Sequence, residues 1–171
     1  MPDDSPVLEF EDVSVSFGDT KALDRVSFQL GAGETRIVYG VAGSGKTTLL
    51  KVALGLVTAD SGTVRVFGRD VTRLPEIEWF DLRAKMGILF QEGGLFDSMT
   101  IADNVAYPLR NQRAMHRPQN GRVDQKVRET LRFVELEQTL DKFPSELSGG
   151  MRRRVGIARA IVTEPPVVLY D

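Results

Sequence analysis

The chain has 171 residues and a formal net charge of −2, from 22 Lys and Arg against 24 Asp and Glu. This near balance indicates neither a nucleic-acid-binding surface nor a polybasic membrane patch. The absence of cysteine and the presence of a single histidine, His116, exclude disulfides, thiol catalysis and zinc held by Cys or His clusters.

The beginning of the chain does not resemble a signal peptide, because it carries Asp3 and Asp4 where basic residues would stand. No apolar stretch approaches the roughly 18 residues that a membrane span needs. Hydrophobic residues make up 42% of the chain, enough to build a core. We therefore expect a globular, cytoplasmic protein with no direct membrane insertion.

The first half of the chain reads as strands around one helix. Alternating apolar and polar residues predict two antiparallel strands, at 7–17 and 26–30, with a turn around Gly18 and Asp19. Residues 35–39 predict a short strand that runs into a glycine-rich loop. The following helix is indicated by apolar residues at helical spacing: Leu49, Leu50, Ala53, Leu54 and Val57. Residues 61–68 predict a strand, 74–85 a helix and 86–90 a buried strand.

The second half reads as helices followed by one strand. Thr100 with Asp103 favours a capped helix over 101–110, and the polar segment 111–122 predicts a surface loop. A second helix is indicated by an apolar stripe: Val123, Val127, Leu131 and Val134. Ser148 can cap a third helix, whose apolar face comprises Met151, Val155, Ala158 and Val162. A strand follows at 167–171. Alternating strands and helices favour a parallel sheet.

A phosphate-binding pattern spans Gly40 to Thr47, which fits G-x-x-x-x-G-K-[ST] between a predicted strand and a predicted helix. Glycines let backbone N–H groups approach phosphates, and the helix N-terminus favours negative charge. Lys46 supplies a positive charge, and the Thr47 hydroxyl can bind Mg²⁺. The alternative is a glycine-rich turn without function.

A second pattern opens the last predicted helix, at Leu147-Ser148-Gly149-Gly150-Met151. A capping Ser followed by two glycines makes a helix start that can accept an anion. Such a turn is common, so it indicates a function only together with the phosphate-binding pattern about a hundred residues earlier and with Gln91 between the two.

In this order the motifs resemble those of ATP-binding cassette (ABC) ATPases, and the resemblance covers essentially the whole chain. It implies an α/β fold of the P-loop NTPase type, with a mixed sheet core, an N-terminal antiparallel β subdomain and a helical insertion. It also implies ATP and Mg²⁺ as ligands. The second subunit of a homodimer would close its signature over the ATP held by the P-loop of the first.

The resemblance assigns roles to individual residues. Gln91 would support catalysis and contact Mg²⁺ or the attacking water, and Asp171 and Thr47 would complete the metal site. The signature acting in trans would be Leu147, Ser148, Gly149, Gly150 and Met151. The ATP-binding residues would be Phe17, Gly40, Val41, Ala42, Gly43, Ser44, Gly45, Lys46, Thr47 and Thr48. The alternatives are a core aromatic for Phe17, an ordinary loop residue for Gln91 and a turn residue for Asp171.

A narrower resemblance rests on residues 87–110 and 147–161. It is to the ATPases of phospholipid-trafficking systems of the lipid-asymmetry and toluene-tolerance type. It implies transport of phospholipid or another apolar substrate, and docking of a membrane permease onto Leu95, Phe96 and Met99, with Ile101 beside them. These residues could instead fill the core of the helical lobe. Arg152, Arg153 and Arg154 could form a phosphate or lipid patch, although a solvated helix face is the simpler reading.

The expected organisation is one nucleotide-binding domain over 1–171, with 1–90 and 147–171 as the ATP-binding core and 91–146 as the helical subdomain. The family's catalytic Glu would follow Asp171 and is not in the sequence, nor is its switch His, since His116 lies in the helical lobe. We therefore expect a domain incomplete at its C-terminus, which binds ATP better than it hydrolyses it.

The expected function is to energise a membrane transporter from the cytoplasmic face of the inner membrane, through a permease and without nucleic acid. The alternatives are a non-hydrolysing nucleotide-binding module and an ABC-type ATPase of translation or DNA repair.

Overall fold

The computed structural model describes residues 6–91, 93–111 and 120–171. Its internal contacts divide the chain into two compact units, Met1–Leu82 and Arg83–Asp171, which are considered separately below. The expectation for His116 lies outside the described residues.

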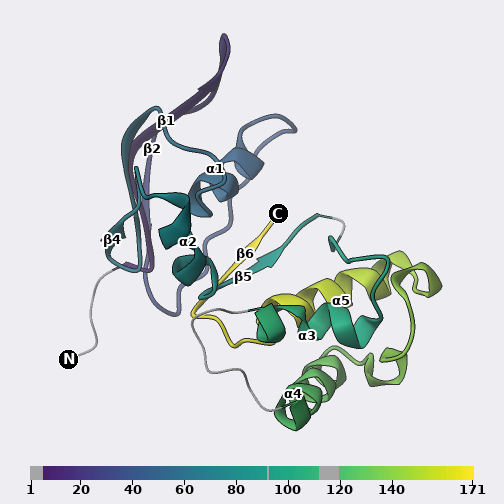
Figure 1. Ribbon diagram of the computed structural model, residues 1–171. Coiled ribbons are helices and arrows are strands. Elements are labelled where there is room, and N and C mark those ends of the chain that lie inside the picture. Colours follow the sequence, from purple (N-terminus) through teal and green to yellow (C-terminus); the bar gives the residue numbers. More distant parts are fainter. Residues whose placement is uncertain (1–5, 92, 112–119) are drawn as a thin grey trace. The chain divides into compact units, whose positions relative to one another are not determined.

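The first unit contains a four-stranded antiparallel sheet in the order β2-β1-β3-β4 (Figure 1). Its strands are β1 (Leu8–Phe17), β2 (Thr20–Leu30), β3 (Ser61–Val66) and β4 (Arg69–Asp70). This confirms the predicted antiparallel pair and the strand at 61–68, with β2 starting earlier than the sequence indicated. One face is buried, and its alternating apolar residues include Phe10, Val13, Val15, Val64 and Val66.

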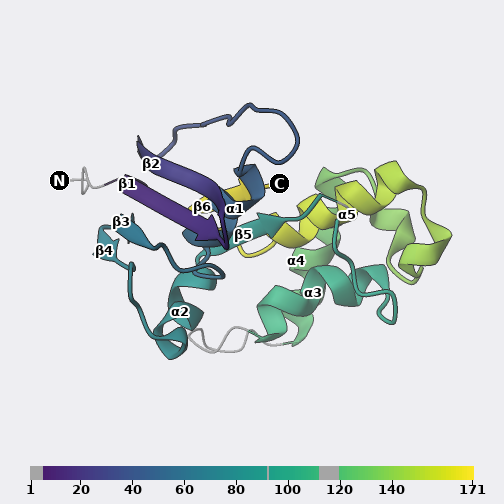
Figure 2. The same ribbon diagram turned by 90° about the horizontal axis from the view of Figure 1, so that it is seen from above.

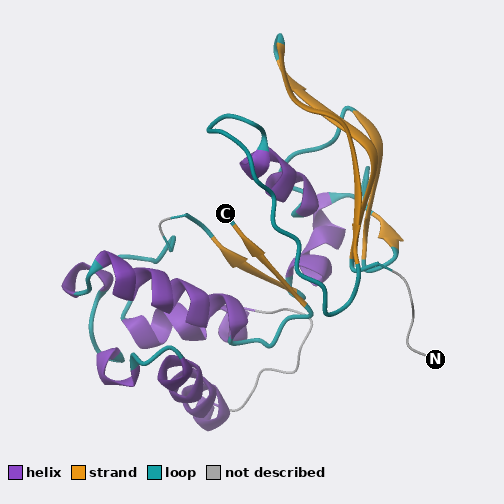
Figure 3. Ribbon diagram, turned by 180° about the vertical axis from the view of Figure 1, so that it is seen from behind, coloured by secondary structure: helices purple, strands orange, loops and turns teal. Residues whose placement is uncertain are grey.

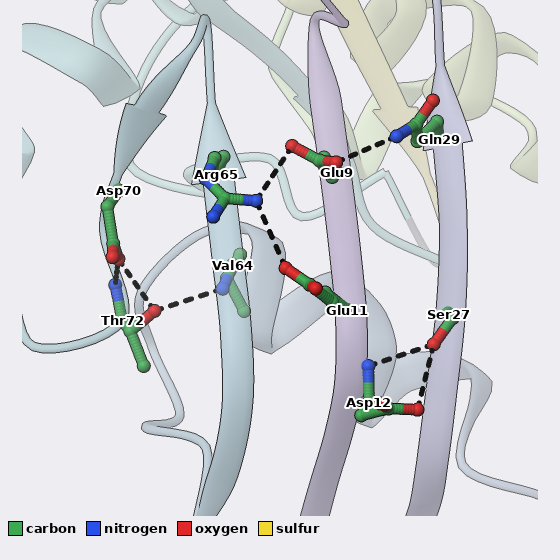
Figure 4. A network of polar contacts seen from close by, with 9 residues as sticks. All are labelled: Glu9, Glu11, Asp12, Ser27, Gln29, Val64, Arg65, Asp70 and Thr72. Carbon is green, nitrogen blue, oxygen red and sulfur yellow. Dashed lines mark hydrogen bonds and ion pairs between the residues drawn. The ribbon is translucent and has the colours of Figure 1, made fainter.

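The other face of the sheet carries charges that pair across the strands, as Figure 4 shows. Arg65 on β3 donates from Nη1 to Glu9 Oε2 at 3.1 Å and to Glu11 Oε2 at 3.3 Å. These hydrogen bonds raise the pKa of Arg65. Gln29 on β2 donates to the other oxygen of Glu9 at 2.7 Å. A slip of one residue would bury these side chains, so the pairs are consistent with a single register.

Two helices complete the first unit, α1 (Lys46–Ala53) and α2 (Glu76–Arg83), whose last residue begins the second unit. Helix α1 ends before the predicted Val57 because Gly55 adopts φ +66°, a left-handed conformation that terminates helices. A Cβ atom at Gly55 would also clash with the ring of Trp79. The buried residues of both helices are Leu49, Val52, Ala53, Trp79 and Leu82.

The predicted strand at 35–39 is wrong. Residues 31–45 form a long loop between β2 and α1 (Figure 2), in which Ile37 and Tyr39 are exposed. An apolar, β-rich run becomes a strand only where a neighbouring strand satisfies its backbone groups. Within the described part of the chain, no strand pairs with this run.

The second unit contains a two-stranded parallel sheet of β5 (Met86–Leu89) and β6 (Val167–Tyr170). Helix α5 (Gly149–Ile161) precedes β6 in sequence and packs against β5. A Cβ atom at Gly87 would clash with the Ala160 carbonyl oxygen, so this glycine allows the helix to approach the strand closely. The predicted parallel pairing is confirmed.

Helices α3 (Ile101–Asn111), α4 (Asn120–Phe133) and α5 surround a helical core, visible as the purple helix group of the second unit in Figure 3. Two short 3₁₀ turns, Glu137–Thr139 and Pro144–Glu146, connect α4 to α5. The predicted apolar stripe is confirmed, and α4 begins at Asn120, inside the segment predicted as a loop. Its first turn has no acidic residue, so one of the usual signals for a helix start is missing. The helical core comprises Ile101, Val105, Ala106, Val123, Val127, Leu131, Val134, Leu136, Leu147, Val155, Ala158 and Val162.

One polar side chain on the inner side of α3, Asn104, is completely buried and fully hydrogen-bonded. Its Oδ1 accepts from the Phe96 amide at 2.8 Å. Its Nδ2 donates to the carbonyls of Phe96, Met99 and Thr100 at 3.0–3.2 Å. Asn104 therefore anchors the segment that leads into α3, whose start is capped by Thr100 Oγ1 accepting from the Asp103 amide at 3.1 Å.

Among the helices described, none combines the length and the apolar character that a crossing of the bilayer would require.

Replacing Asn104 by Ala should lower the free energy of unfolding by about 3 kcal/mol, because the Phe96 amide and three carbonyls lose their buried partner. The measurement is urea unfolding followed by circular dichroism at 222 nm. Asn111→Ala is the matched control, since Asn111 is exposed and donates to the Tyr107 carbonyl, and its effect should stay within about 0.5 kcal/mol. Equal effects of the two changes would contradict the anchoring role of Asn104.

Candidate functional site

The phosphate-binding pattern forms a tight loop that leads directly into α1. Gly43 and Gly45 have φ values of +80° and +88°, which L-residues with side chains rarely adopt. A Cβ atom at Gly45 would clash with the Ala22 carbonyl oxygen on β2 and come within 3.1 Å of Leu23 Cδ2. Glycine is thus required where this loop crosses β2. Gly45 also starts α1 with no side-chain cap and no acidic residue in the first turn.

The ammonium of Lys46 lies among the oxygens of its own loop. It donates to the carbonyls of Gly40 at 2.9 Å and Val41 at 2.8 Å, and to Ser44 Oγ at 3.4 Å. The loop therefore places a positive charge beside the N-terminus of α1, whose backbone dipole also favours an anion. This arrangement has the charge and the backbone donors needed to hold a polyphosphate.

Phe17 stands at the end of β1 with 54% of its surface exposed, so the alternative that it is a core aromatic is wrong. The core aromatic of this strand is Phe10, which stacks on Phe28 at a ring distance of 4.8 Å. An exposed ring can stack on a planar base. Thr47 is exposed and Thr48 is half-buried, both in the first turn of α1.

Gln91 and Asp171 lie at the same edge of the parallel sheet in the second unit. The two strands pair Leu89 with Tyr170, and the Asp171 amide donates to the Leu89 carbonyl at 3.0 Å. Both side chains therefore follow the carboxyl ends of adjacent parallel strands, where ligands of open α/β sheets commonly bind. Thr47, the third predicted metal ligand, belongs to the first unit.

The signature segment caps α5. Ser148 Oγ accepts from the Met151 amide at 3.3 Å, which confirms the predicted cap. Leu147 is buried in the helical core, whereas Ser148, Gly149 and Gly150 are exposed. At Gly149 a Cβ atom would meet only the far end of Arg152, at 4.0 Å, and at Gly150 it would meet nothing. The two glycines thus leave the first turn of α5 uncovered, and no close contact with a described residue of the second unit requires them.

The predicted docking residues lie between β5 and α3. The ring centres of Phe96 and Tyr107 lie 4.8 Å apart, and Phe96 is partly exposed. Leu95 packs against the helical core. Met99 is half-buried. Ile101 is completely buried, so the alternative of core filling is correct for this residue.

The three arginines at 152–154 do not form one uniform charged patch. Arg152 donates to the Leu147 carbonyl at 2.8 Å and Arg154 to the Val134 carbonyl at 3.1 Å. Arg153 is exposed, with its guanidinium 5.6 Å from the centre of the Tyr170 ring. Two of the three guanidinium groups therefore bind the chain's own backbone.

Sequence reasoning missed Asn104 and Arg159, which bind the segment after Gln91. Arg159 on α5 donates from Nη1 to the Gly94 carbonyl at 2.8 Å and from Nη2 to the Gly93 carbonyl at 2.9 Å. A signal was available for Asn104, a polar residue between Ile101 and Val105 on the apolar face of a predicted helix.

Comparison with known proteins gives a consistent result. A family model described as ABC transporter matches residues 23–171. The methionine import ATP-binding protein MetN of Clostridium tetani is 41% identical over 165 residues, covering 96% of this chain and 51% of the relative. The sulfate/thiosulfate import ATP-binding protein CysA 2 of Shewanella oneidensis is 40% identical, covering 96% and 45%. The probable ribonucleotide transport ATP-binding protein Mkl of Mycobacterium leprae is 36% identical, covering 96% and 46%.

Solved structures give the same fold. The ATP-binding cassette MJ0796, in a dimeric post-hydrolysis state with ADP and Pi, matches with a TM-score of 0.87 and 29% identity, covering 96% of this chain and 73% of that one. CbiO1 of Clostridium perfringens, part of the ABC transporter complex cbiONQ, matches with a TM-score of 0.83 and 26% identity, covering 97% and 65%.

The chain spans about half the length of the curated relatives it matches. Its predicted fold class, α/β of the P-loop NTPase type, is confirmed by these structures. With the family model matching all but the first 22 residues, the chain belongs to the ABC transporter family, within its ATP-binding cassettes.

Proposed function

We propose that this chain is the ATP-binding part of a subunit that energises an ABC membrane transporter. The observation that carries the proposal is the loop over 40–47, which places the Lys46 ammonium beside the N-terminus of α1 and turns through glycines at positive φ. A nucleotide triphosphate is the ligand whose charge matches this site. Family membership and the ADP-bound structure of a relative support the same ligand.

Mg²⁺ would be held by Thr47, Gln91 and Asp171, whose side-chain oxygens are the donors that it prefers. Over residues 6–91, 93–111 and 120–171, no group of three or more His, Cys, Asp and Glu could hold a metal on its own. That fits Mg²⁺, which usually keeps several waters and uses phosphate oxygens as further ligands. When bound, the ion neutralises charge that develops on the phosphates.

For the reaction, Lys46 would bind the β and γ phosphates, and exposed Phe17 would stack on the base. Gln91 would orient the attacking water at the carboxyl edge of β5, next to Asp171. Because phosphoryl transfer relies on positioning and charge more than on covalent chemistry, these residues would act mainly by fixing geometry. That the 171 residues bind ATP better than they hydrolyse it stays a prediction.

We further propose that two copies sandwich ATP, with Ser148, Gly149 and Gly150 of one copy closing on the nucleotide of the other. Uncovered glycines and a helix N-terminus suit close approach by phosphate. The dimeric state of MJ0796 supports this arrangement.

CbiO1, as part of a transporter complex, supports a membrane permease as the second partner, docked on Leu95, Phe96 and Met99. The chain would then lie on the cytoplasmic face of the membrane.

A separate proposal concerns the transported substrate. The relatives carry names for the import of methionine or sulfate and for ribonucleotide transport. The narrower proposal, a phospholipid or another apolar molecule, rests on the sequence of residues 87–110 and 147–161. Its test is co-purification of the natural protein with its permease, followed by mass spectrometry of bound lipids; recovery of a permease that binds only methionine or sulfate would overturn it.

Lys46→Ala should weaken binding of a fluorescent ATP analogue at least about a hundredfold, because charged hydrogen bonds of about 1.5–3 kcal/mol to the phosphates are lost. The affinity is measured by fluorescence titration. Lys51→Ala, an exposed lysine in the last turn of the same helix, is the control and should bind as the wild type does. Unchanged affinity in Lys46→Ala would refute the nucleotide site.

Ser148→Arg should leave ATP binding by the monomer intact and abolish the ATP-driven dimer seen by light scattering, because a bulky cation then blocks the surface of the first turn of α5. Ser148→Ala removes only the helix cap, worth about 1 kcal/mol, and so separates lost stability from blocked approach. Ser145→Arg, on the preceding 3₁₀ turn, controls for added charge. A dimer that persists in Ser148→Arg would remove the role in trans.

A further inference from the structure

Gly93 and Gly94 lie against one face of α5, the helix that begins with the signature. The contacts come from Arg152, Gly156 and Arg159, spaced four and three residues apart and therefore on one helix face. A Cβ atom at Gly93 would lie 3.1 Å from the Arg152 carbonyl oxygen. A Cβ atom at Gly156 would lie 2.6 Å from Leu89 Cδ1 and 3.1 Å from Gly93 Cα. Glycine on both sides thus brings the two backbones together.

Arg159 fixes this contact with a forked pair of hydrogen bonds. Its two terminal nitrogens donate to the carbonyls of Gly94 and Gly93 at 2.8 and 2.9 Å, and its guanidinium carbon lies 5.7 Å from the centre of the Phe96 ring. Gly93 and Gly94 have φ values of +80° and +54°. Two successive residues in the left-handed region are costly for other amino acids, and the turn they form is held by the guanidinium.

Burial lowers the pKa of Arg159, although an arginine stays charged in proteins. Removing a guanidinium from water is costly unless carbonyls and an aromatic face replace the lost hydration. The carbonyls of Gly93 and Gly94 and the ring of Phe96 surround the guanidinium together only while residues 93–96 keep their present conformation. The cost of burial therefore links the side chain of Arg159 to the conformation of residues 93–96.

We propose that Arg159 is a positioning residue for Gln91: its fork joins the loop that follows Gln91 to α5, so that the signature end of the helix and Gln91 are held in one rigid arrangement. The effect of Arg159 on catalysis rests on the proposed function, whereas its hold on Gly93 and Gly94 does not. Asn104 holds the far end of the same segment, from Phe96 to Thr100. The near end, at Gly93 and Gly94, is bound by Arg159.

The test compares backbone ¹⁵N order parameters of the full chain in the wild type and in Arg159→Lys. Lysine keeps the charge and most of the stem but lacks the planar fork. The order parameters of the Gly93 and Gly94 amides should fall from about 0.85 to below about 0.6, the range of flexible backbone. The Phe96 amide, which donates to Asn104 Oδ1, should keep its value and serves as an internal reference.

Two further variants make the outcome decisive. Arg159→Gln loses both the charge and the fork and should loosen the same two amides, which covers the case in which the lysine variant does not fold. Arg153→Lys, on the exposed face of the same helix, should change neither amide. Unchanged order parameters at Gly93 and Gly94 in the folded Arg159 variants would overturn the proposal.

The functional readout is ATP turnover by the natural protein that carries this chain. Arg159→Lys should lower kcat about tenfold with the affinity for ATP within about twofold, because a displaced Gln91 affects the reaction and not the phosphate loop. A loosened loop with wild-type kcat would overturn the positioning role. If the wild type binds no ATP, the proposed function fails, while the order parameters still decide whether Arg159 holds the loop.

Discussion

Backbone carbonyls that no strand or helix can pair need another donor, and this constraint shapes the loops over 40–47 and 93–96. In the phosphate loop the donor is Lys46, whose ammonium binds the carbonyls of Gly40 and Val41. After Gln91 it is Arg159, which binds the carbonyls of Gly93 and Gly94. Each loop thus binds a cationic side chain of a neighbouring helix, Lys46 of α1 or Arg159 of α5. Glycines at positive φ allow both turns.

The cations differ in a way that suits their surroundings. Lysine carries a compact charge on a flexible stem, so the Lys46 ammonium can change partners with little loss of geometry. Arginine presents a rigid fork, which fits two neighbouring carbonyls and stacks on a ring such as that of Phe96. A loop that would bind a ligand gains from the mobile charge of lysine, and a loop that holds another segment in place gains from the rigid fork of arginine. The chain uses each residue in the place where its chemistry applies.

Sequence patterns predicted those elements that depend on local signals. Alternation predicted β1 and the second half of β2, the apolar stripe of Val123 and Val127 predicted α4, and Ser148 marked the start of α5. Prediction failed where a partner distant in sequence decides the structure. Residues 35–39 have strand-forming residues without a described strand beside them, and Arg159 appeared as one more basic residue on α5. Motif spacing located Lys46, Gln91, Ser148 and Asp171. Their roles depend on where ligands and partner chains bind, and the spacing of motifs does not give those positions.

The contacts of Lys46 also bear on which anions this loop can distinguish. Because Gly40 and Val41 already compensate its charge, an incoming anion competes with internal dipoles for the ammonium. A singly charged anion gains little from that exchange, whereas a polyphosphate reaches the ammonium, the loop amides and the start of α1 together. With a nucleotide bound as proposed, the loop would therefore favour anions of high charge density over small, singly charged ones.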